Sequence, residues 1–189
     1  MAKLEKGLLH VYTGEGKGKT SAALGLAMRA VGRGLNVLVL QYFKLESEPS
    51  GELAFREGLR PRPAVDGGEA GHLVFRRGDY RHPFFDREAD REAIRAKVLE
   101  QTALAAAEMK AGFWDVVVLD EVNNALRDRF ILFEELEALL EARPAHVELV
   151  CTGRGAPAEL VDLADYVTEM TALKHPGARK IAARKGIEF

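Results

Sequence analysis

A glycine-rich stretch near the N-terminus, TGEGKGKTS from Thr13 to Ser21, constrains the fold of this chain more than any other feature. An apolar run, Leu8 to Tyr12, precedes it, and a run of helix formers from Lys19 to Val31 follows it. A strand, a glycine loop and a helix in this order are typical of the phosphate-binding loop of nucleotide enzymes. The usual spacing would place the first glycine at position 13, whereas the available glycine here is Gly14. The sequence therefore predicts a phosphate-binding loop with a displaced glycine.

The residue types in this loop suit a polyphosphate. Glycines let backbone N–H groups approach phosphate oxygens, and the following helix adds the positive end of its dipole. Lys19 would place an ammonium on the phosphates and Thr20 a hydroxyl on a magnesium ion, while Lys17 is either a second cation or a solvated loop lysine. The predicted nucleotide-binding residues are Gly14, Glu15, Gly16, Lys17, Gly18, Lys19, Thr20 and Ser21. The alternative is a glycine-rich turn that happens to contain Gly-Lys-Thr.

A second motif, WDVVVLDE, places Asp120 and Glu121 at the end of an apolar run. A carboxylate at the carboxyl end of a buried strand, beside a phosphate loop, can hold a metal directly or through its waters. Neighbouring side chains diverge along an extended chain, so we expect one carboxylate to serve the metal and the other to position substrate. Arg154 in TGRGAP also follows a strand, and we expect either a phosphate contact or a surface arginine there.

Short apolar runs alternate with longer helical patterns from end to end. This alternation predicts parallel strands joined by crossover helices, in a three-layer α/β fold of the P-loop NTPase-like (RecA-like) kind with a mainly parallel sheet of about six strands. The 189 residues fit one domain, 1–189. Within it, 44–85 is a long glycine- and proline-rich loop that is either a working part, which we expect to be a substrate loop, or disordered, with at most a short helix near 52–56 and a short strand near Ala64. We expect Asp86 to cap the helix that follows. The predicted strands are 8–12, 37–43, 114–119, 147–152 and 166–170, and the other helices are 19–31, 133–140 and one that opens at 157.

Composition narrows the function classes. A net charge of -2 disfavours a partner bound through phosphate neutralisation, so we expect no nucleic acid. The single cysteine, Cys151, excludes an internal disulfide and a cysteine-based zinc site, and no apolar stretch is long enough to span a bilayer. We therefore expect a soluble, cytoplasmic protein with no membrane partner.

Several segments together resemble one family. GEGKGKTSAALGLAMRAVGRG, VLVLQYFK, FWDVVVLDEVNNAL, TGRGAPAELVDLADYVTEM, the LKH triplet and the closing ARKGIEF are similar, in order and spacing, to the ATP:corrinoid adenosyltransferases. The match spans nearly the whole chain, and the displaced glycine looks like that family's own version of the loop.

The resemblance implies an activity and its requirements. It implies transfer of the 5′-deoxyadenosyl group of ATP to the Co(I) of a reduced corrinoid, either cob(I)alamin or cob(I)yrinic acid a,c-diamide, with release of triphosphate, in cobalamin biosynthesis or salvage. Lys19, Thr20 and Glu121 would be the catalytic residues, and Mg²⁺ or Mn²⁺ would be held by Thr20 and Glu121, with Asp120 beside them. An electron-donating reductase or flavoprotein and a homodimer are also implied.

The family places a phenylalanine and a tryptophan before an Asn-Arg-Glu-Ala-Asp segment, where they displace the lower ligand of cobalt. The corresponding positions here hold Tyr80 and His82, so these are the predicted corrinoid contacts, and an imidazole at 82 could instead ligate cobalt. Tyr80, His82, Phe84 and Phe85 form an aromatic-rich end of the long loop that is either the seat of a flat ligand or a local cluster.

Two other classes remain open from the sequence. One is an ordinary P-loop ATPase or kinase, in which Glu121 orients water or an acceptor hydroxyl towards the terminal phosphorus. The other is a nucleotide-sensing module that binds ATP without catalysis.

Overall fold

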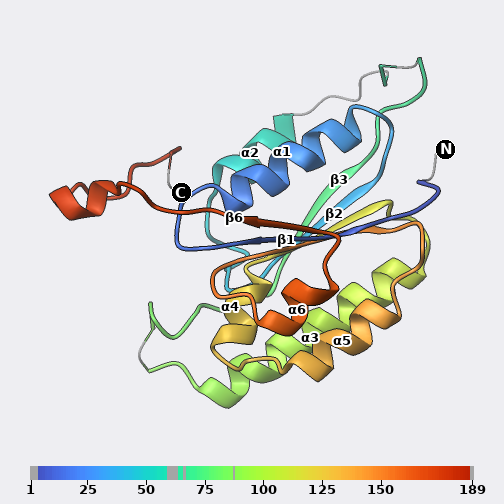
Figure 1. Ribbon diagram of the computed structural model, residues 1–189. Helices are drawn as coiled ribbons and strands as arrows, with labels where there is room; N and C mark the ends of the chain where they lie inside the picture. The colour runs from blue at the N-terminus through green and yellow to red at the C-terminus, as the bar shows by residue number, and fades with distance from the viewer. Residues whose placement is uncertain (1–3, 59–63, 66, 87, 188–189) are drawn as a thin grey trace.

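The described residues of a computed structural model form one six-stranded parallel sheet with helices on both faces, which confirms the predicted fold class (Figure 1). The structure describes residues 4–58, 64–65, 67–86 and 88–187. The strand order is β3-β2-β4-β5-β1-β6, and each neighbouring pair is parallel. Within these ranges no helix is both long and apolar enough to cross a membrane.

One or two helices separate each strand from the next along the chain, because parallel strands need a crossover connection. Helices α1 and α2 cover one face of the sheet, and α3, α4, α5 and α6 cover the other (Figure 1). The strands are β1 (Leu9–Thr13), β2 (Val37–Gln41), β3 (Leu73–Arg77), β4 (Val116–Asp120), β5 (Glu148–Thr152) and β6 (Tyr166–Glu169). The helices are α1 (Lys19–Val31), α2 (Gly51–Gly58), α3 (Arg91–Lys110), α4 (Val122–Arg127), α5 (Phe133–Glu141) and α6 (Ala158–Leu163), followed by a 3₁₀ turn, η1 (Pro176–Arg179).

Burial explains the apolar runs of the sequence. Every residue of β2 and β4 is buried, because both faces of these central strands are covered by helices. Alternate residues of the strands pack into two core clusters, one beneath α1 and a larger one beneath α3 to α6. The edge strand β6 is exposed at all four positions.

The structure differs from the expected elements in the segment 44–85. The strand expected near Ala64 was wrong: Ala64 lies in irregular backbone, and the strand is β3, nine residues further on, where HLVFRR pairs with β2. A helix and an edge strand therefore occupy much of what the sequence suggested was one long loop. Among the described residues of this segment, the parts around the start of α2 and after β3 reach the cavities at the carboxyl edge of the sheet, because α2 connects β2 to its parallel neighbour β3.

One helix boundary differs from the prediction, and one short helix was not predicted. Helix α3 is capped by Asp90, whose carboxylate accepts the N–H of Glu92, and not by Asp86, which accepts the N–H of Glu88 in the preceding turn. The short helix α4, directly after β4, had no prediction because its six residues are too few to show a helical period.

Candidate functional site

The glycine loop lies at the carboxyl end of β1 and packs against the end of β6. Gly14 has a φ of 91° and Gly18 a φ of 120°, which glycine adopts without strain. A Cβ on Gly14 or Gly16 would lie 2.5 or 2.6 Å from the carbonyl oxygen of Met170. The N–H of Gly16 donates to that same oxygen at 2.6 Å, so this amide is directed to β6, whereas we expected it to face the phosphates.

Lys19 is the buried cation of the loop. Its Nζ donates to the carbonyl oxygens of Gly14 at 2.6 Å and Gly16 at 2.7 Å, which holds the ammonium inside the turn. Burial lowers the pKa of Lys19, while the carboxylate of Glu121 raises it. An approaching anion therefore interacts more favourably with this poorly hydrated ammonium than it would with a solvated one.

Asp120, the last residue of β4, accepts a hydrogen bond from the hydroxyl of Thr20, the residue after Lys19. Its Oδ1 accepts the hydroxyls of Thr20 at 2.8 Å and Thr152 at 2.7 Å, and its Oδ2 accepts the Nε2 of Gln41 at 3.4 Å. Burial raises the pKa of Asp120, and these three hydrogen bonds oppose the rise. Because Thr20 donates its only proton to Asp120, its oxygen lone pairs remain available for a cation.

Glu121 is held in a left-handed conformation, with a φ of 69°. Such backbone is uncommon outside glycine and concentrates at functional sites. The N–H of Glu121 donates to the Oγ1 of Thr152 at 3.0 Å, and its carboxylate accepts from the side chain of Asn124. Burial raises the pKa of Glu121, and the neighbouring carboxylate of Asp120 raises it further. The turn thus sends the adjacent carboxylates of Asp120 and Glu121 to different partners, as we expected.

A cavity of about 570 Å³ opens in front of the loop. Of the predicted binding residues, Gly14 is outside its lining. The others line it, namely Glu15, Gly16, Lys17, Gly18, Lys19, Thr20, Ser21, Asp120, Glu121 and Arg154. The guanidinium of Arg154 lies 3.3 Å from the exposed carboxylate of Glu15. The loop residues and the two carboxylates therefore meet in one hollow whose size suits a nucleotide.

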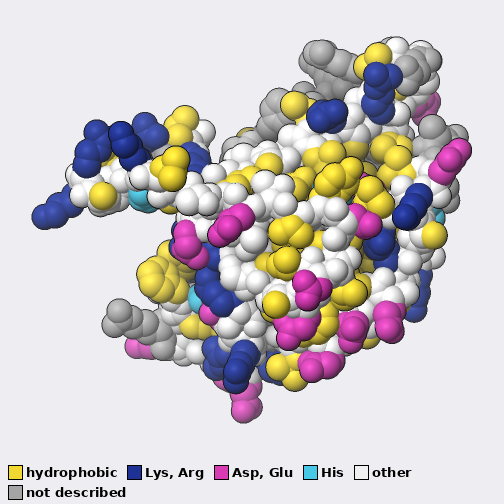
Figure 2. All heavy atoms as spheres, viewed as in Figure 1, with side chains coloured by type: hydrophobic (Ala, Val, Ile, Leu, Met, Phe, Trp, Pro, Cys, Tyr) yellow, Lys and Arg dark blue, Asp and Glu magenta, His cyan; other side chains and the backbone are white. Residues whose placement is uncertain are grey.

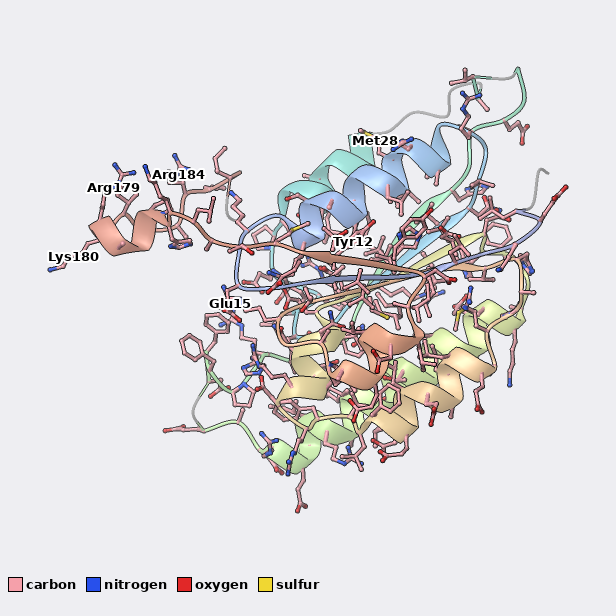
Figure 3. All side chains as sticks on the ribbon, in the orientation of Figure 1. Tyr12, Glu15, Met28, Arg179, Lys180 and Arg184 are labelled. Carbon is pink, nitrogen blue, oxygen red and sulfur yellow. The ribbon has the colours of Figure 1, made fainter. Side chains whose placement is uncertain are left out.

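The C-terminal segment reaches the same cavity next to the glycine loop. His175, Gly186 and Ile187 line it, and the Nζ of Lys17 donates to the carbonyl oxygen of Ile187 at 2.6 Å. The rest of this arm extends away from the sheet, with Arg179, Lys180 and Arg184 at its outer part (Figure 3). Lys and Arg side chains dominate its visible surface (Figure 2).

A second cavity, of about 610 Å³, lies beside the first and is rich in aromatic side chains. Its lining comprises Tyr42, Phe43, Lys44, His82, Phe84, Phe85, Glu121, Asn124, Arg127 and Arg154. The rings of Phe43 and His82 meet edge to face, with centroids 4.8 Å apart, while Phe84 and Phe85 are largely exposed. Three charged residues, Lys44, Glu121 and Arg154, line both cavities, so they stand where the two meet.

The two residues predicted to contact a corrinoid lie in different environments. His82 lines the aromatic cavity, with its Nε2 2.8 Å from Asp128 and its Nδ1 3.1 Å from the N–H of Phe84, which donates to it. Both ring nitrogens are therefore hydrogen-bonded, and ligation of cobalt by this imidazole would require one bond to break. Tyr80 is instead in the core, 5% exposed, and its hydroxyl donates to Gln101 at 2.6 Å.

The donor set at the loop fits a small, hard divalent cation. Mg²⁺ prefers oxygen ligands and keeps several waters, so one hydroxyl and one or two carboxylates beside a phosphate group suffice. Thr20 and Glu121 offer such oxygens, and Asp120 lies behind Thr20. Within the described ranges no three His, Cys, Asp or Glu side chains cluster into a site that could hold a metal by themselves.

Sequence reasoning missed several residues that line the cavities. Lys44 and Phe43 follow β2 directly, and the rule that ligands bind beyond the carboxyl ends of parallel strands could have found them. Gln41 and Arg77 carry no motif and are polar residues within strands. Asn124 and Arg127 lie on α4, for which there was no prediction.

Comparison with known proteins gives one consistent result. Residues 5–189 match the sequence model of the family described as "ATP:corrinoid adenosyltransferase BtuR/CobO/CobP". The chain is 37% identical to a corrinoid adenosyltransferase of Pseudomonas aeruginosa over 188 residues, which cover 100% of this chain and 86% of that one. It is also 37% identical to the corrinoid adenosyltransferase CobA of Salmonella typhimurium and 35% identical to that of Escherichia coli K12, in each case over 100% of this chain and 88% of the relative.

Proposed function

This chain belongs to the ATP:corrinoid adenosyltransferase family BtuR/CobO/CobP, and from that premise we propose how its two cavities divide the reaction between them. The activity is corrinoid adenosylation, with ATP as co-substrate. The loop cavity takes ATP, and the aromatic cavity takes the corrinoid. The observation that carries this assignment is the shared wall of Lys44, Glu121 and Arg154, because a group can pass between two substrates only where their sites meet.

In the loop cavity, Lys19 and backbone amides of the loop hold the triphosphate. Lys19 is already buried among loop carbonyls, so its charge is placed before the nucleotide arrives. Preorganised donors of this kind stabilise charge that gathers on a leaving group without reorganising during the reaction. We infer that the triphosphate lies along the loop and that the ribose 5′ carbon faces the shared wall.

In the aromatic cavity, Phe43, His82, Phe84 and Phe85 offer apolar ring surface to one face of the corrin macrocycle. The Co(I) atom attacks the 5′ carbon of ATP, the bond between that carbon and its oxygen breaks, and triphosphate leaves. Co(I) is itself a strong nucleophile, so the chain needs no side-chain nucleophile. Alignment of the two reacting atoms can supply about 7–11 kcal/mol of the barrier.

Mg²⁺ or Mn²⁺, when bound, would supply positive charge beside the triphosphate oxygens. The oxygens of Thr20 and Glu121 would hold it, while Asp120 keeps Thr20 in place through the 2.8 Å hydrogen bond. The left-handed turn at Glu121 directs its carboxylate to the junction of the cavities, where this charge is needed. Neutralisation of the leaving group is the contribution that a metal makes in phosphate chemistry generally.

Two partners are expected: an electron donor, which the chemistry requires, and a second copy of the chain, which the family resemblance implies. Because Co(I) is a reduced state, an electron donor such as a reductase or flavoprotein must supply it. A homodimer is the assembly that we expect, and sedimentation velocity at several concentrations would test it. A monomer at every concentration would contradict that expectation.

Product identity tests the function. Incubation with ATP, Mg²⁺ and a chemically reduced corrinoid should release intact triphosphate and give a light-sensitive carbon–cobalt product. Release of ADP and orthophosphate, with no corrinoid product, would instead indicate an ordinary P-loop ATPase. Tight ATP binding without turnover would indicate a binding module.

A variant pair tests the loop assignment. Lys19→Ala removes the charge-assisted contact to phosphate, so we expect ATP binding and turnover to fall together. Lys110→Ala, in the last turn of α3 on an exposed surface, is the matched control and should behave as the wild type. Unchanged kinetics in Lys19→Ala would show that the loop takes no part in the reaction.

A further inference from the structure

A buried arginine at the end of β3, Arg77, lines the ATP cavity away from the glycine loop and its motif residues. The side chain of Arg77 is 1% exposed, which is rare for an arginine unless its donors are paired. Its Nε donates to the Oε1 of Gln41 at 3.0 Å and its Nη2 to the Oγ of Ser50 at 2.7 Å. Its Nη1 donates to two backbone carbonyls, those of Leu45 at 2.9 Å and of Glu48.

Apart from Gln41, these acceptors belong to one segment, 44–50, which contains no helix or strand. Irregular backbone leaves carbonyls without the partners that a sheet or helix would provide, and buried carbonyls need partners. The guanidinium supplies them, because its planar fork can reach several acceptors at once. Arg77 therefore fixes the shape of a segment whose own sequence specifies no regular structure.

The same segment forms the wall of the ATP cavity opposite the phosphate loop. Lys44, Glu48, Pro49 and Ser50 line the cavity, and Glu52 in the first turn of α2 continues the wall. A nucleotide held by the loop would have this wall on its other side. The position of the wall then affects how tightly ATP is enclosed.

Arg77 also sets the orientation of Gln41. Because the Oε1 of Gln41 accepts from Arg77, its Nε2 is turned towards Glu52 at 3.1 Å and towards Asp120 at 3.4 Å. Asp120 in turn accepts the hydroxyl of Thr20. A continuous set of hydrogen bonds thus runs from Arg77 to the hydroxyl next to Lys19.

We propose that Arg77 is a positioning residue for ATP, which acts through the wall 44–50 and through Gln41, because its three side-chain nitrogens already donate to these groups. This proposal rests on the proposed function only in assigning ATP to the loop cavity. Arginine is required, since a lysine keeps the charge but has one nitrogen where the fork has three. The effect should fall more on ATP than on the corrinoid, because Lys44, Glu48, Pro49 and Ser50 of this segment line the ATP cavity, whereas the aromatic cavity takes only Lys44 from it.

The test is calorimetric titration of Arg77→Lys with ATP and Mg²⁺ in the absence of corrinoid. We expect the dissociation constant for ATP to rise roughly tenfold, the factor that loss of one or two hydrogen bonds to a charged group corresponds to. Hydrogen exchange should quicken in peptides that span 44–50. In turnover, KM for ATP should rise more than KM for the corrinoid.

Arg76→Lys is the matched control. Arg76 precedes Arg77 on β3 and is half exposed, with its guanidinium 2.9 Å from Glu108 and away from both cavities. It should match the wild type in ATP binding and in exchange at 44–50. If Arg77→Lys does not fold, Ser50→Ala, which removes a single acceptor, carries the test with a smaller rise in the dissociation constant.

Three outcomes would overturn the proposal. These are a folded Arg77→Lys variant with the wild-type dissociation constant, a weaker ATP complex with unchanged exchange at 44–50, and equal losses for ATP and corrinoid. Because binding is measured without corrinoid, the result does not depend on adenosyl transfer. A wild-type chain that binds ATP but makes no adenosylated corrinoid would overturn the proposed function and leave this inference intact.

Discussion

Asp120→Asn tests the hydrogen-bond network at the centre of the site. The asparagine keeps one oxygen, which can still accept the hydroxyls of Thr20 and Thr152. Its new NH₂ group then faces the Nε2 of Gln41, and Gln41 cannot turn round because its Oε1 already accepts from Arg77. Two donors therefore face each other where the wild type has a donor and an acceptor.

The expected loss of stability in Asp120→Asn is too small to unfold the domain, so the loss of activity can be measured on folded protein. A buried donor left without an acceptor costs about 1–3 kcal/mol. Burial raises the pKa of Asp120, so removal of the charge returns part of that cost. A domain with a free energy of unfolding of about 5–15 kcal/mol stays folded after such a loss. Activity should fall roughly 10- to 100-fold, as it does when a residue that orients a metal ligand is changed.

The assay is kcat/KM for adenosylation, measured with a thermal melt of the same samples. Asp115→Asn is the matched control, because Asp115 is also buried, precedes the same strand β4 and accepts the N–H of Asn36 at 2.9 Å. It lies at the opposite end of β4 from the cavities, so it should keep its activity. Wild-type activity in Asp120→Asn, or an equal loss in Asp115→Asn, would refute the reasoning.

Further predictions concern pH, the aromatic turn and the cysteine. The pKa of Glu121 is raised above its ordinary value of 4.5, so the folded protein holds this proton more tightly than the unfolded chain does. The protonated carboxyl therefore stabilises the fold at low pH, and this stabilisation is lost as pH rises through the folded pKa. Glu121→Gln should therefore have a higher melting temperature than the wild type near pH 7 and the same melting temperature below pH 4.5. It should also abolish the acid limb of the kcat/KM profile. Equal melting temperatures at both pH values would contradict this reasoning. His82→Phe keeps the ring contacts but loses both hydrogen bonds, so KM for the corrinoid should rise roughly three- to tenfold while ATP binding is unchanged, whereas total inactivity in a folded variant would show that the imidazole ligates cobalt. Burial raises the pKa of Cys151 to about 12, so a thiol reagent at pH 8 should label it only after unfolding, and fast labelling of the native protein would disprove its burial.

Local features of the sequence were enough for much of the fold. The glycine loop, the helix over Lys19–Val31 and the buried apolar runs are set by residues close in sequence, and the structure confirms them. Segments that depend on distant partners were harder to predict. Strand β3 contains two arginines, so its pattern does not indicate a strand, and it forms because β2 has an edge to pair with.

The candidate site divides in the same way. Lys19, Thr20, Asp120 and Glu121 were predicted from motifs, and the structure brings them into one cavity. Tyr80 was chosen by its position in the sequence, whereas the structure places it in the core beneath that site. No motif indicated Arg77, because its partners are spread over Gln41 and the segment 44–50.

The sequence by itself determined that a phosphate loop and a pair of carboxylates exist and which family they belong to, since motif spacing is a property of neighbouring residues. Only the tertiary structure decided three other features. The amide of Gly16 donates to the carbonyl of Met170, just after β6, and Glu121 lines both cavities. The buried guanidinium of Arg77 holds the segment 44–50 that forms a wall of the ATP cavity. These three facts depend on hydrogen bonds between residues far apart in the chain, and directional bonds form only when the packed core has fixed both partners in space.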